Sequence, residues 1–266
     1  MKEEALALVE KMDDPSRALN LLREYLQMSV LRSLHESEAF INLSFVGGTA
    51  LRLIYDLPRF SEDLDFSLEE AVGYQPRRWM EKLKRDLQLA GFDATVSLNE
   101  HKTVHAAWIR VTGLLEEAGL AGRKEQKLSV KLEIDTRPPP GAVSSTEVIT
   151  RQQMFVVRRH DLASLMAGKI HALLTRPYPK GRDWYDLVWY LSRRPPVTPN
   201  LVLLQNALDQ TEGKGAVDGS RWTRSLLDRL KSLDMSALAA DVQPFLERPA
   251  DVQYLTAEHL RTLLQS

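Results

Sequence analysis

FVGGTALRLIYDLPRFSEDLDFSL, residues 45–68, is the stretch that decides the fold of this chain. It begins within an apolar run, residues 43–46, which leads into Gly47-Gly48 and then into a helix-like segment, residues 49–55. This order predicts a strand, a glycine turn and the start of a helix. Free backbone N–H groups and the helix dipole favour an anion such as phosphate at such a helix start. We therefore expect an anion-binding turn at Gly47, Gly48 and Thr49.

Asp63 and Asp65 form the second element of this stretch, with Leu64 and Phe66 at the alternate positions. On a strand, this spacing places the two carboxylates on one face and the two apolar residues in the core. Paired carboxylates in a partly desolvated cleft are costly unless a cation or a shared proton compensates them. Mg²⁺ suits them because it is usually held by one or two carboxylates together with substrate phosphates. Taken singly, the glycines could be an ordinary turn and the aspartates a solvated strand edge; the combination predicts a metal and phosphate site.

These segments resemble the AbiEii/AbiGii toxin family of nucleotidyltransferases, within the DNA polymerase β-like superfamily. The signature of the superfamily is hG[GS], a spacer and Dh[DE]h, which residues 46–48 and 63–66 match. The spacer of 14 residues, 49–62, is long for the superfamily, and the AbiEii-like branch carries its arginine and serine there, seen here as Arg59 and Ser61. The resemblance implies one or two Mg²⁺ ions, an NTP as substrate, and nucleotide contacts that include Arg52 on the helix-like segment.

Length, charge and cysteine content exclude several classes of protein. The 266 residues are 44% hydrophobic, which is enough for two modest domains, and we place them at residues 1–150 and 151–266. A formal charge of −1, from 35 basic and 36 acidic residues, excludes a globally polycationic nucleic-acid binder. The absence of cysteine excludes disulfides and a thiol nucleophile and fits a cytoplasmic protein. The acidic, amphipathic N-terminus, and the lack of any run near the ~20 apolar residues of a membrane span, predict no membrane association.

The expected fold is α+β: a nucleotidyltransferase core with a mixed β-sheet flanked by helices, followed by an all-helical C-terminal domain. Apolar periodicity predicts helices within residues 3–38 and 76–90. Alternation predicts strands at residues 41–46, 93–98, 104–111 and 128–136. A linker begins at residues 137–141, and helices alone are expected beyond residue 151.

A third carboxylate is expected on the strand LSVKLEIDT, residues 128–136. Val130, Leu132 and Ile134 point one way, while Lys131, Glu133 and Asp135 point the other. A two-metal site needs a third acidic residue on a strand beside the first two. Glu133 fits the hEh pattern of the family best, Asp135 is the competitor, and both could instead be surface charges.

Residues 160–176, HDLASLMAGKIHALLTR, form an amphipathic helix with Lys169 inside its apolar stripe. A lysine there should either snorkel or meet an anion, and we expect the triphosphate; Lys169→Met should then fold at least as well as the parent. With the following RDWYDL, this is the second segment that resembles the family, which implies that Lys169, Arg182, Asp183 and Asp186 take part in activity. Asp183 could instead cap its own helix. Residues 168–194 carry six basic and two acidic side chains, 6 − 2 = +4, which suits a triphosphate or an RNA backbone.

The resemblance implies Mg²⁺-dependent transfer of a nucleoside monophosphate from an NTP to an acceptor hydroxyl, with release of pyrophosphate. It further implies a toxin of a toxin-antitoxin or phage-defence pair, with a cognate antitoxin as partner and RNA, the 3′ end of a tRNA, as acceptor. We expect the active site between the core and the helical domain. Two alternatives are a transferase that modifies a small hydroxylated molecule, such as an antibiotic, and a non-catalytic nucleotide-binding module.

Overall fold

The computed structural model describes residues 1–123 and 125–265, which form two compact units. The first unit comprises residues 1–56, 60–138 and 145–159. The second comprises residues 57–59, 139–144 and 160–266. The short segment Leu57–Arg59 therefore belongs to the second unit, although its neighbours on both sides in the sequence belong to the first.

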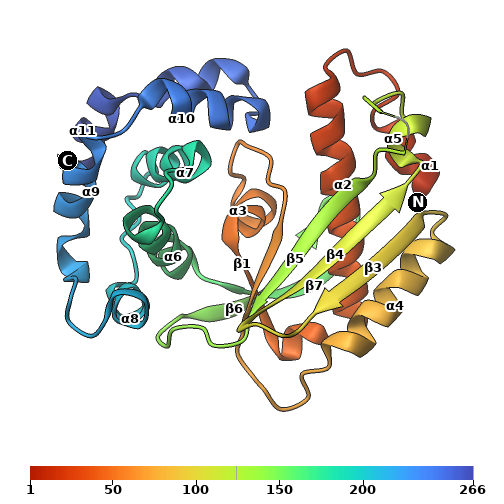
Figure 1. Ribbon diagram of the computed structural model, residues 1–266, viewed down its shortest axis with the longest axis horizontal. Helices are drawn as coiled ribbons and strands as arrows, with labels where there is room; N and C mark the ends of the chain where they lie inside the picture. Colours follow the sequence, from red (N-terminus) through yellow and green to blue (C-terminus); the bar gives the residue numbers. More distant parts are fainter. Residues whose placement is uncertain (124, 266) are drawn as a thin grey trace. The chain divides into compact units, whose positions relative to one another are not determined.

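A mixed sheet of seven strands organises the first unit, in the order β3-β4-β5-β2-β1-β7-β6 (Figure 1). The pairs β1–β2, β3–β4 and β4–β5 are antiparallel, whereas β2–β5 and β1–β7 are parallel. The strands are β1 (Leu43–Val46), β2 (Leu64–Leu68), β3 (Asp93–Asn99), β4 (Val104–Thr112), β5 (Leu128–Asp135), β6 (Ser144–Thr150) and β7 (Met154–His160). This architecture confirms the predicted mixed sheet with flanking helices.

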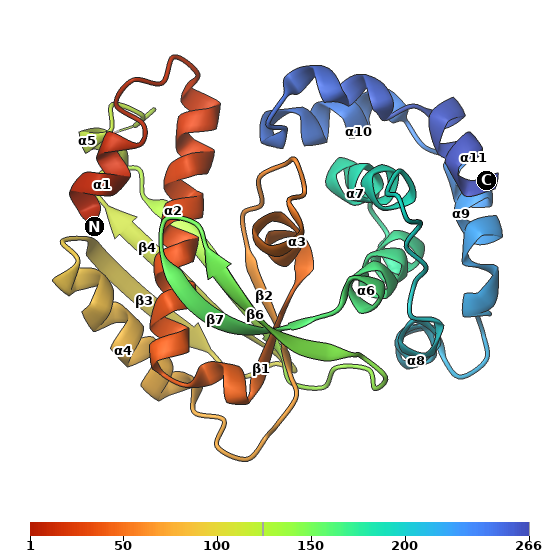
Figure 2. The same cartoon turned by 180° about the vertical axis from the view of Figure 1, so that it is seen from behind.

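Helices α2 (Pro15–Glu36) and α4 (Pro76–Leu89) cover one face of the sheet (Figures 1 and 2). α2 begins where the sequence signals a start, because Pro15 is its first residue and the side chain of Asp14 accepts hydrogen bonds from the next two backbone N–H groups. Alternation in β5 places Leu128, Val130, Leu132 and Ile134 in the core, as predicted. Helix α3 (Gly47–Tyr55) follows β1 directly, and the short helices α1 (Lys2–Ala7) and α5 (Leu114–Glu117) complete the unit.

Strand β7 corrects the expectation of helices alone beyond residue 151, and β6 lies immediately before that point. Their sequences, SSTEVIT and MFVVRRH, contain the β-branched residues that favour strands. The proline-rich run at residues 137–141 suggests that the core domain ends there, yet the chain returns to pair β7 alongside β1, with Phe45 opposite Arg159. The predicted boundary at residues 150 and 151 lies between two neighbouring strands of one sheet.

The second unit is helical, which confirms the predicted character of the C-terminal region. Its helices are α6 (Leu162–Thr175), α7 (Gly181–Leu191), α8 (Leu201–Glu212), α9 (Trp222–Leu230), α10 (Met235–Val242) and α11 (Ala257–Gln265). The side chains of Asp161, Asn200 and Asp234 cap three of these helices by accepting hydrogen bonds from backbone N–H groups. None of the helices in the described residues has the length and apolarity that a membrane crossing requires.

Candidate active site

Asp65 and Glu133 lie side by side on neighbouring strands. In the parallel pair β2–β5, Asp65 is directly opposite Glu133, and paired residues point to the same face of a sheet. Asp63 lies immediately before β2, two residues from Asp65, which places it on the same side. All three carboxylates are half-buried. The fold therefore places Asp65 and Glu133 together on one face, with Asp63 at the point where β2 begins.

Gly47 is the position of the glycine turn at which no other residue can replace glycine. Its φ of +77° lies in the left-handed region, which favours glycine. A Cβ atom added to Gly47 would also lie 2.2 Å from Oδ2 of Asp65. The Asp65 carboxylate is thus seated against the first turn of α3, where the helix dipole stabilises its negative charge.

The backbone that leads into Asp63 is held from two sides. Thr49, fully buried in α3, donates its hydroxyl hydrogen bond to the carbonyl of Asp63. Gln27 of α2 donates from Nε2 to the carbonyls of Ser61, at 3.0 Å, and Glu62, at 2.9 Å. Thr49, predicted to contact nucleotide, therefore uses its side chain to position the backbone at Asp63.

Gln27 is a functional neighbour that the sequence analysis overlooked. With Asn20 and Glu24 it forms a row of buried polar residues at helical spacing along α2. Buried polar side chains need partners, so this row was a signal that α2 supports polar structure.

Arg52 lies in the core of the first unit. Its Nε is 2.7 Å from Oε2 of Glu24, and its guanidinium stacks over Phe60 at 4.6 Å from the ring centroid. Both charged side chains are buried. A contact between Arg52 and a nucleotide would require this buried pair to open, and the role of Arg52 in nucleotide binding stays a prediction.

Register separates the two candidates for the third carboxylate. Glu133 is opposite Asp65, whereas Asp135 is opposite Ser67, one step further along the face. Glu133 lies 2.7 Å from Nζ of Lys131, and Asp135 accepts a hydrogen bond from the backbone N–H of Arg137 at 2.9 Å.

The carboxylates fit a magnesium site whose coordination is completed by substrate. Within residues 1–123 and 125–265, no group of three or more His, Asp or Glu side chains is arranged to hold a metal by itself. Mg²⁺ is normally held by one or two carboxylates, with water and phosphate oxygens as the remaining ligands. Asp63 and Asp65 supply two such hard oxygen donors, half exposed, with Glu133 beside them.

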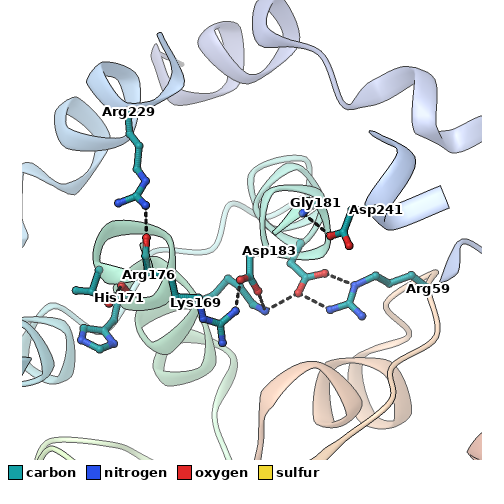
Figure 3. A network of polar contacts seen from close by, with 10 residues as sticks. Arg59, Lys169, His171, Arg176, Gly181, Asp183, Arg229 and Asp241 are labelled. Carbon is teal, nitrogen blue, oxygen red and sulfur yellow. Dashed lines mark hydrogen bonds and ion pairs between the residues drawn. The ribbon is translucent and has the colours of Figure 1, made fainter. Parts of the chain in front are cut away.

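The second unit contains a network of five charged side chains, four of them largely buried and the fifth, Arg176, partly exposed (Figure 3). Asp186 is fully buried, and its carboxylate accepts hydrogen bonds from Nε and Nη2 of Arg59, each at 2.6 Å. Nζ of Lys169 lies 2.7 Å from both Asp183 and Asp186. Arg176 pairs with the other oxygen of Asp183. Lys169 thus meets an anion, as its place in an apolar stripe predicts, but the anions are two carboxylates of its own unit.

Electrostatics holds this network in its charged form. Burial alone would lower the pKa of Lys169, but Asp183 and Asp186 outweigh it and raise that pKa above its ordinary value. Burial likewise opposes the ionisation of Asp183, but Lys169 and Arg176 lower the pKa of Asp183 to about 2. These ion pairs join three cations, Arg59, Lys169 and Arg176, to two carboxylates, Asp183 and Asp186.

Asp183 does not cap α7. The N-cap is Lys180, and the described residues show no side-chain cap at that position. Asp241 of α10 instead accepts the hydrogen bond of the Gly181 backbone N–H, at 2.7 Å. A Cβ atom at Gly181 would lie 1.9 Å from the carbonyl oxygen of Leu238, so only glycine lets α10 approach α7 this closely. Arg182 stacks over Phe245, 4.4 Å from its centroid.

The pKa of Asp183 predicts a loss of stability in acid. Because this pKa falls from 3.8 to about 2 on folding, the folded state binds fewer protons than the unfolded state between these values. The resulting stabilisation, about 2 kcal/mol, is fully present above about pH 4 and is lost as the pH falls towards 2. Urea unfolding between these pH values should show a steeper decline for the parent than for Asp183→Asn. Parallel curves for the two proteins would contradict the assignment.

The sequence matches a family described as nucleotidyl transferase AbiEii toxin of type IV toxin-antitoxin systems, over residues 29–262. Two solved structures share the fold. A candidate nucleotidyltransferase from H. pylori aligns with a TM-score of 0.56 and 20% identity, over 92% of each chain. JHP933 from Helicobacter pylori aligns with a TM-score of 0.53 and 21% identity, over 92% of this chain and 90% of that one. A search among curated proteins gave no match.

Proposed function

The chain belongs to the AbiEii family of nucleotidyltransferase toxins, and from this premise we propose that it transfers a nucleoside monophosphate from an NTP to a hydroxyl group at the 3′ end of a tRNA. The family membership confirms the resemblance carried by residues 43–66 and 168–187. As a nucleotidyltransferase of a type IV toxin-antitoxin system, the protein takes an NTP and has a cognate antitoxin as partner. Mg²⁺ dependence, phage defence and a cytoplasmic site of action are further parts of the proposal.

The observation that carries this proposal is the alignment of Asp65 with Glu133, beside the turn at Gly47. Asp63 and Asp65 would hold Mg²⁺, and Glu133 would complete the site for a second ion. The metal, when bound, supplies positive charge to the phosphates and lowers the pKa of a coordinated hydroxyl group. The tight turn excludes side-chain bulk, so the backbone of Gly47 and Gly48 would approach the phosphates closely.

The charged network of α6 and α7 was expected to bind the nucleotide directly, but its members bind one another. Arg59, Lys169, Asp183 and Asp186 bind one another, so we assign them as positioning residues that fix α6 and α7. The network reaches solvent at Arg176, whose side chain is 44% exposed. A phosphate group of the NTP or of the RNA would bind this guanidinium, and Arg182 and Ser61 would add further nucleotide contacts.

Labelling separates this proposal from its alternatives. The protein is incubated with Mg²⁺, total tRNA and a mixture of small hydroxylated acceptors, and the four α-labelled NTPs are tested separately. Label on RNA, with release of pyrophosphate, supports the proposal. Label on a small molecule supports an antibiotic-modifying type of enzyme. NTP binding without release of pyrophosphate in any mixture supports a non-catalytic module.

Glu133 and Asp135 should differ in their effect on transfer. Glu133→Gln removes the charge beside Asp65, so we expect kcat to fall by roughly two to three orders of magnitude. Asp135→Asn preserves shape at a position opposite Ser67 and should cost less than about tenfold. Steady-state transfer rates measure both. Small, comparable losses would assign the whole strand a structural role.

A further inference from the structure

Trp108 lies exposed on the sheet face that carries the carboxylates. Its neighbours along β4, Ala107 and Ile109, are buried in the core, so alternation turns Trp108 to the opposite face. Helices α2 and α4 cover the other side of these strands (Figures 1 and 2). A tryptophan that leaves 39% of its surface exposed in the middle of a nine-residue strand is unusual for a side chain of such apolar area.

Two cations accompany the tryptophan ring. The guanidinium of Arg110 lies 5.3 Å from the ring centroid, and Nζ of Lys131 lies 5.7 Å from it. Arg110 also donates a hydrogen bond to the hydroxyl of Ser97 at 3.1 Å, which fixes its position. We call Trp108, Arg110 and Lys131 the cationic tryptophan patch.

Register places this patch within reach of the metal-binding carboxylates. Trp108 is opposite Lys131 on β5, and Leu132, the next residue, is opposite Leu64 on β2. One further step back along both strands brings Asp63 into the row of Trp108 and Lys131. Strands lie about 4.8 Å apart, so the backbone of Trp108 is about 10 Å from that of Asp63. This is the span of one or two nucleotides.

We propose that the cationic tryptophan patch binds the unpaired 3′ end of the RNA acceptor, with a base stacked on Trp108 and a phosphate held by Arg110 and Lys131. The inference rests on the proposed function, because it names where the acceptor of that reaction lies. Aromatic stacking beside cations binds single strands with little preference for base, because every base presents a flat face. An unpaired end can place a base on a side chain, whereas bases within a duplex remain stacked.

The chemistry of the patch favours RNA over a protein partner. The acidic groups nearest the patch lie on β2 and β5, where Mg²⁺ would neutralise them, and Glu133 among them also pairs with Lys131. Asp93, the carboxylate of β3 on this face, lies at the start of that strand, four residues from Ser97. The patch itself carries two cations. A strand of RNA that crosses from the patch to the carboxylates would meet positive charge first and the metal site at its terminal hydroxyl. The order of charges along this surface thus suits an RNA strand whose 3′ end reaches the metal site.

Binding without catalysis tests the proposal directly. A fluorescently labelled single-stranded RNA of about eight nucleotides is titrated in EDTA and without NTP, so no transfer occurs. Trp108→Ala should weaken its binding by roughly tenfold or more, and Trp108→Phe, which keeps an aromatic face, should recover most of the affinity. Tyr254→Ala removes a half-exposed aromatic of the second unit and should leave the affinity unchanged. Circular dichroism confirms that each variant is folded.

Kinetic constants separate the patch from the nucleotide site. For Trp108→Ala, the KM for RNA should rise while the KM for NTP stays unchanged. If Trp108→Ala binds RNA as tightly as the parent, the proposal is overturned. It is also overturned if the substitution raises only the KM for NTP, because Trp108 would then contact the base of the NTP and not the RNA. If the parent labels no RNA yet its single-strand binding depends on Trp108, the tRNA acceptor assignment fails and the patch stands. If the parent labels RNA and Trp108→Ala binds and labels it equally well, the patch fails and the assignment stands.

Discussion

Asp65→Asn is expected to reduce nucleotidyl transfer by roughly three orders of magnitude while the fold persists. The amide keeps the size of the side chain seated against Gly47, where there is no room for a larger group. It removes the charge that would bind Mg²⁺ and leaves Glu133 without its neighbour across the β2–β5 pair. Asp63→Asn should have a similar effect. Transfer at saturating NTP and Mg²⁺ measures the loss, and isothermal titration with Mg²⁺ and NTP provides a readout that does not depend on turnover.

Asp93→Asn is the matched control for this prediction. Asp93 is an exposed carboxylate at the start of the edge strand β3 of the same sheet, so its neutral variant should keep parental activity. Thermal unfolding should show all three variants folded. Near-normal turnover in Asp65→Asn would remove the metal-binding assignment from Asp63 and Asp65 together.

Asp186→Asn is expected to destabilise the protein by about 3–5 kcal/mol, the largest stability effect that we predict. Asp186 is fully buried and binds both Arg59 and Lys169. An amide cannot compensate the two cations, so both would remain buried with a single carboxylate, Asp183, in the network. Urea unfolding at neutral pH measures the change.

A surface ion pair provides the comparison for this loss. Asp228 lies 2.7 Å from Lys231, the same separation as in the network, but both side chains are mostly exposed. Asp228→Asn should therefore leave the midpoint of urea unfolding almost unchanged, because the exposed pair is screened by solvent. Equal effects for the two variants would show that burial does not control the strength of the network. Lys169→Met leaves Arg59 with Asp186 and Arg176 with Asp183, 2 − 2 = 0, so it should be tolerated far better than Asp186→Asn.

The sequence predicted most of the secondary structure of the first unit because its signals are local. Alternation in LSVKLEIDT and the glycine turn of FVGGTAL each depend on residues within a few positions of one another. Strand β7 escaped prediction because its place beside β1 depends on a pairing between Phe45 and Arg159, far apart in the chain. A proline-rich segment between the two, residues 137–141, has the local character of a domain end.

The candidate site likewise has features that local sequence predicted and features that it did not. The spacing of Asp63 and Asp65 predicted that they share one face, and the stripe around Lys169 predicted that its ammonium would meet an anion. The identity of that anion was not predictable, because Asp183 and Asp186 lie on a different helix, α7, and Arg59 is distant in sequence. Likewise, alternation alone permitted Glu133 and Asp135 equally. The family pattern favoured Glu133, and the register with β2 places Glu133 opposite Asp65 and Asp135 opposite Ser67.

By itself, the sequence determined the family, the acidic strand, the glycine turn and the helical character of the C-terminal region. Each of these follows from motif spacing or from local periodicity, which do not depend on how distant segments pack against one another. Tertiary structure alone decided that Asp65 is beside Glu133, that Lys169 and Arg59 are bound to carboxylates of α7, and that Trp108 faces the carboxylate side of the sheet. These depend on strand register and helix packing, which arise from contacts between residues far apart in the chain.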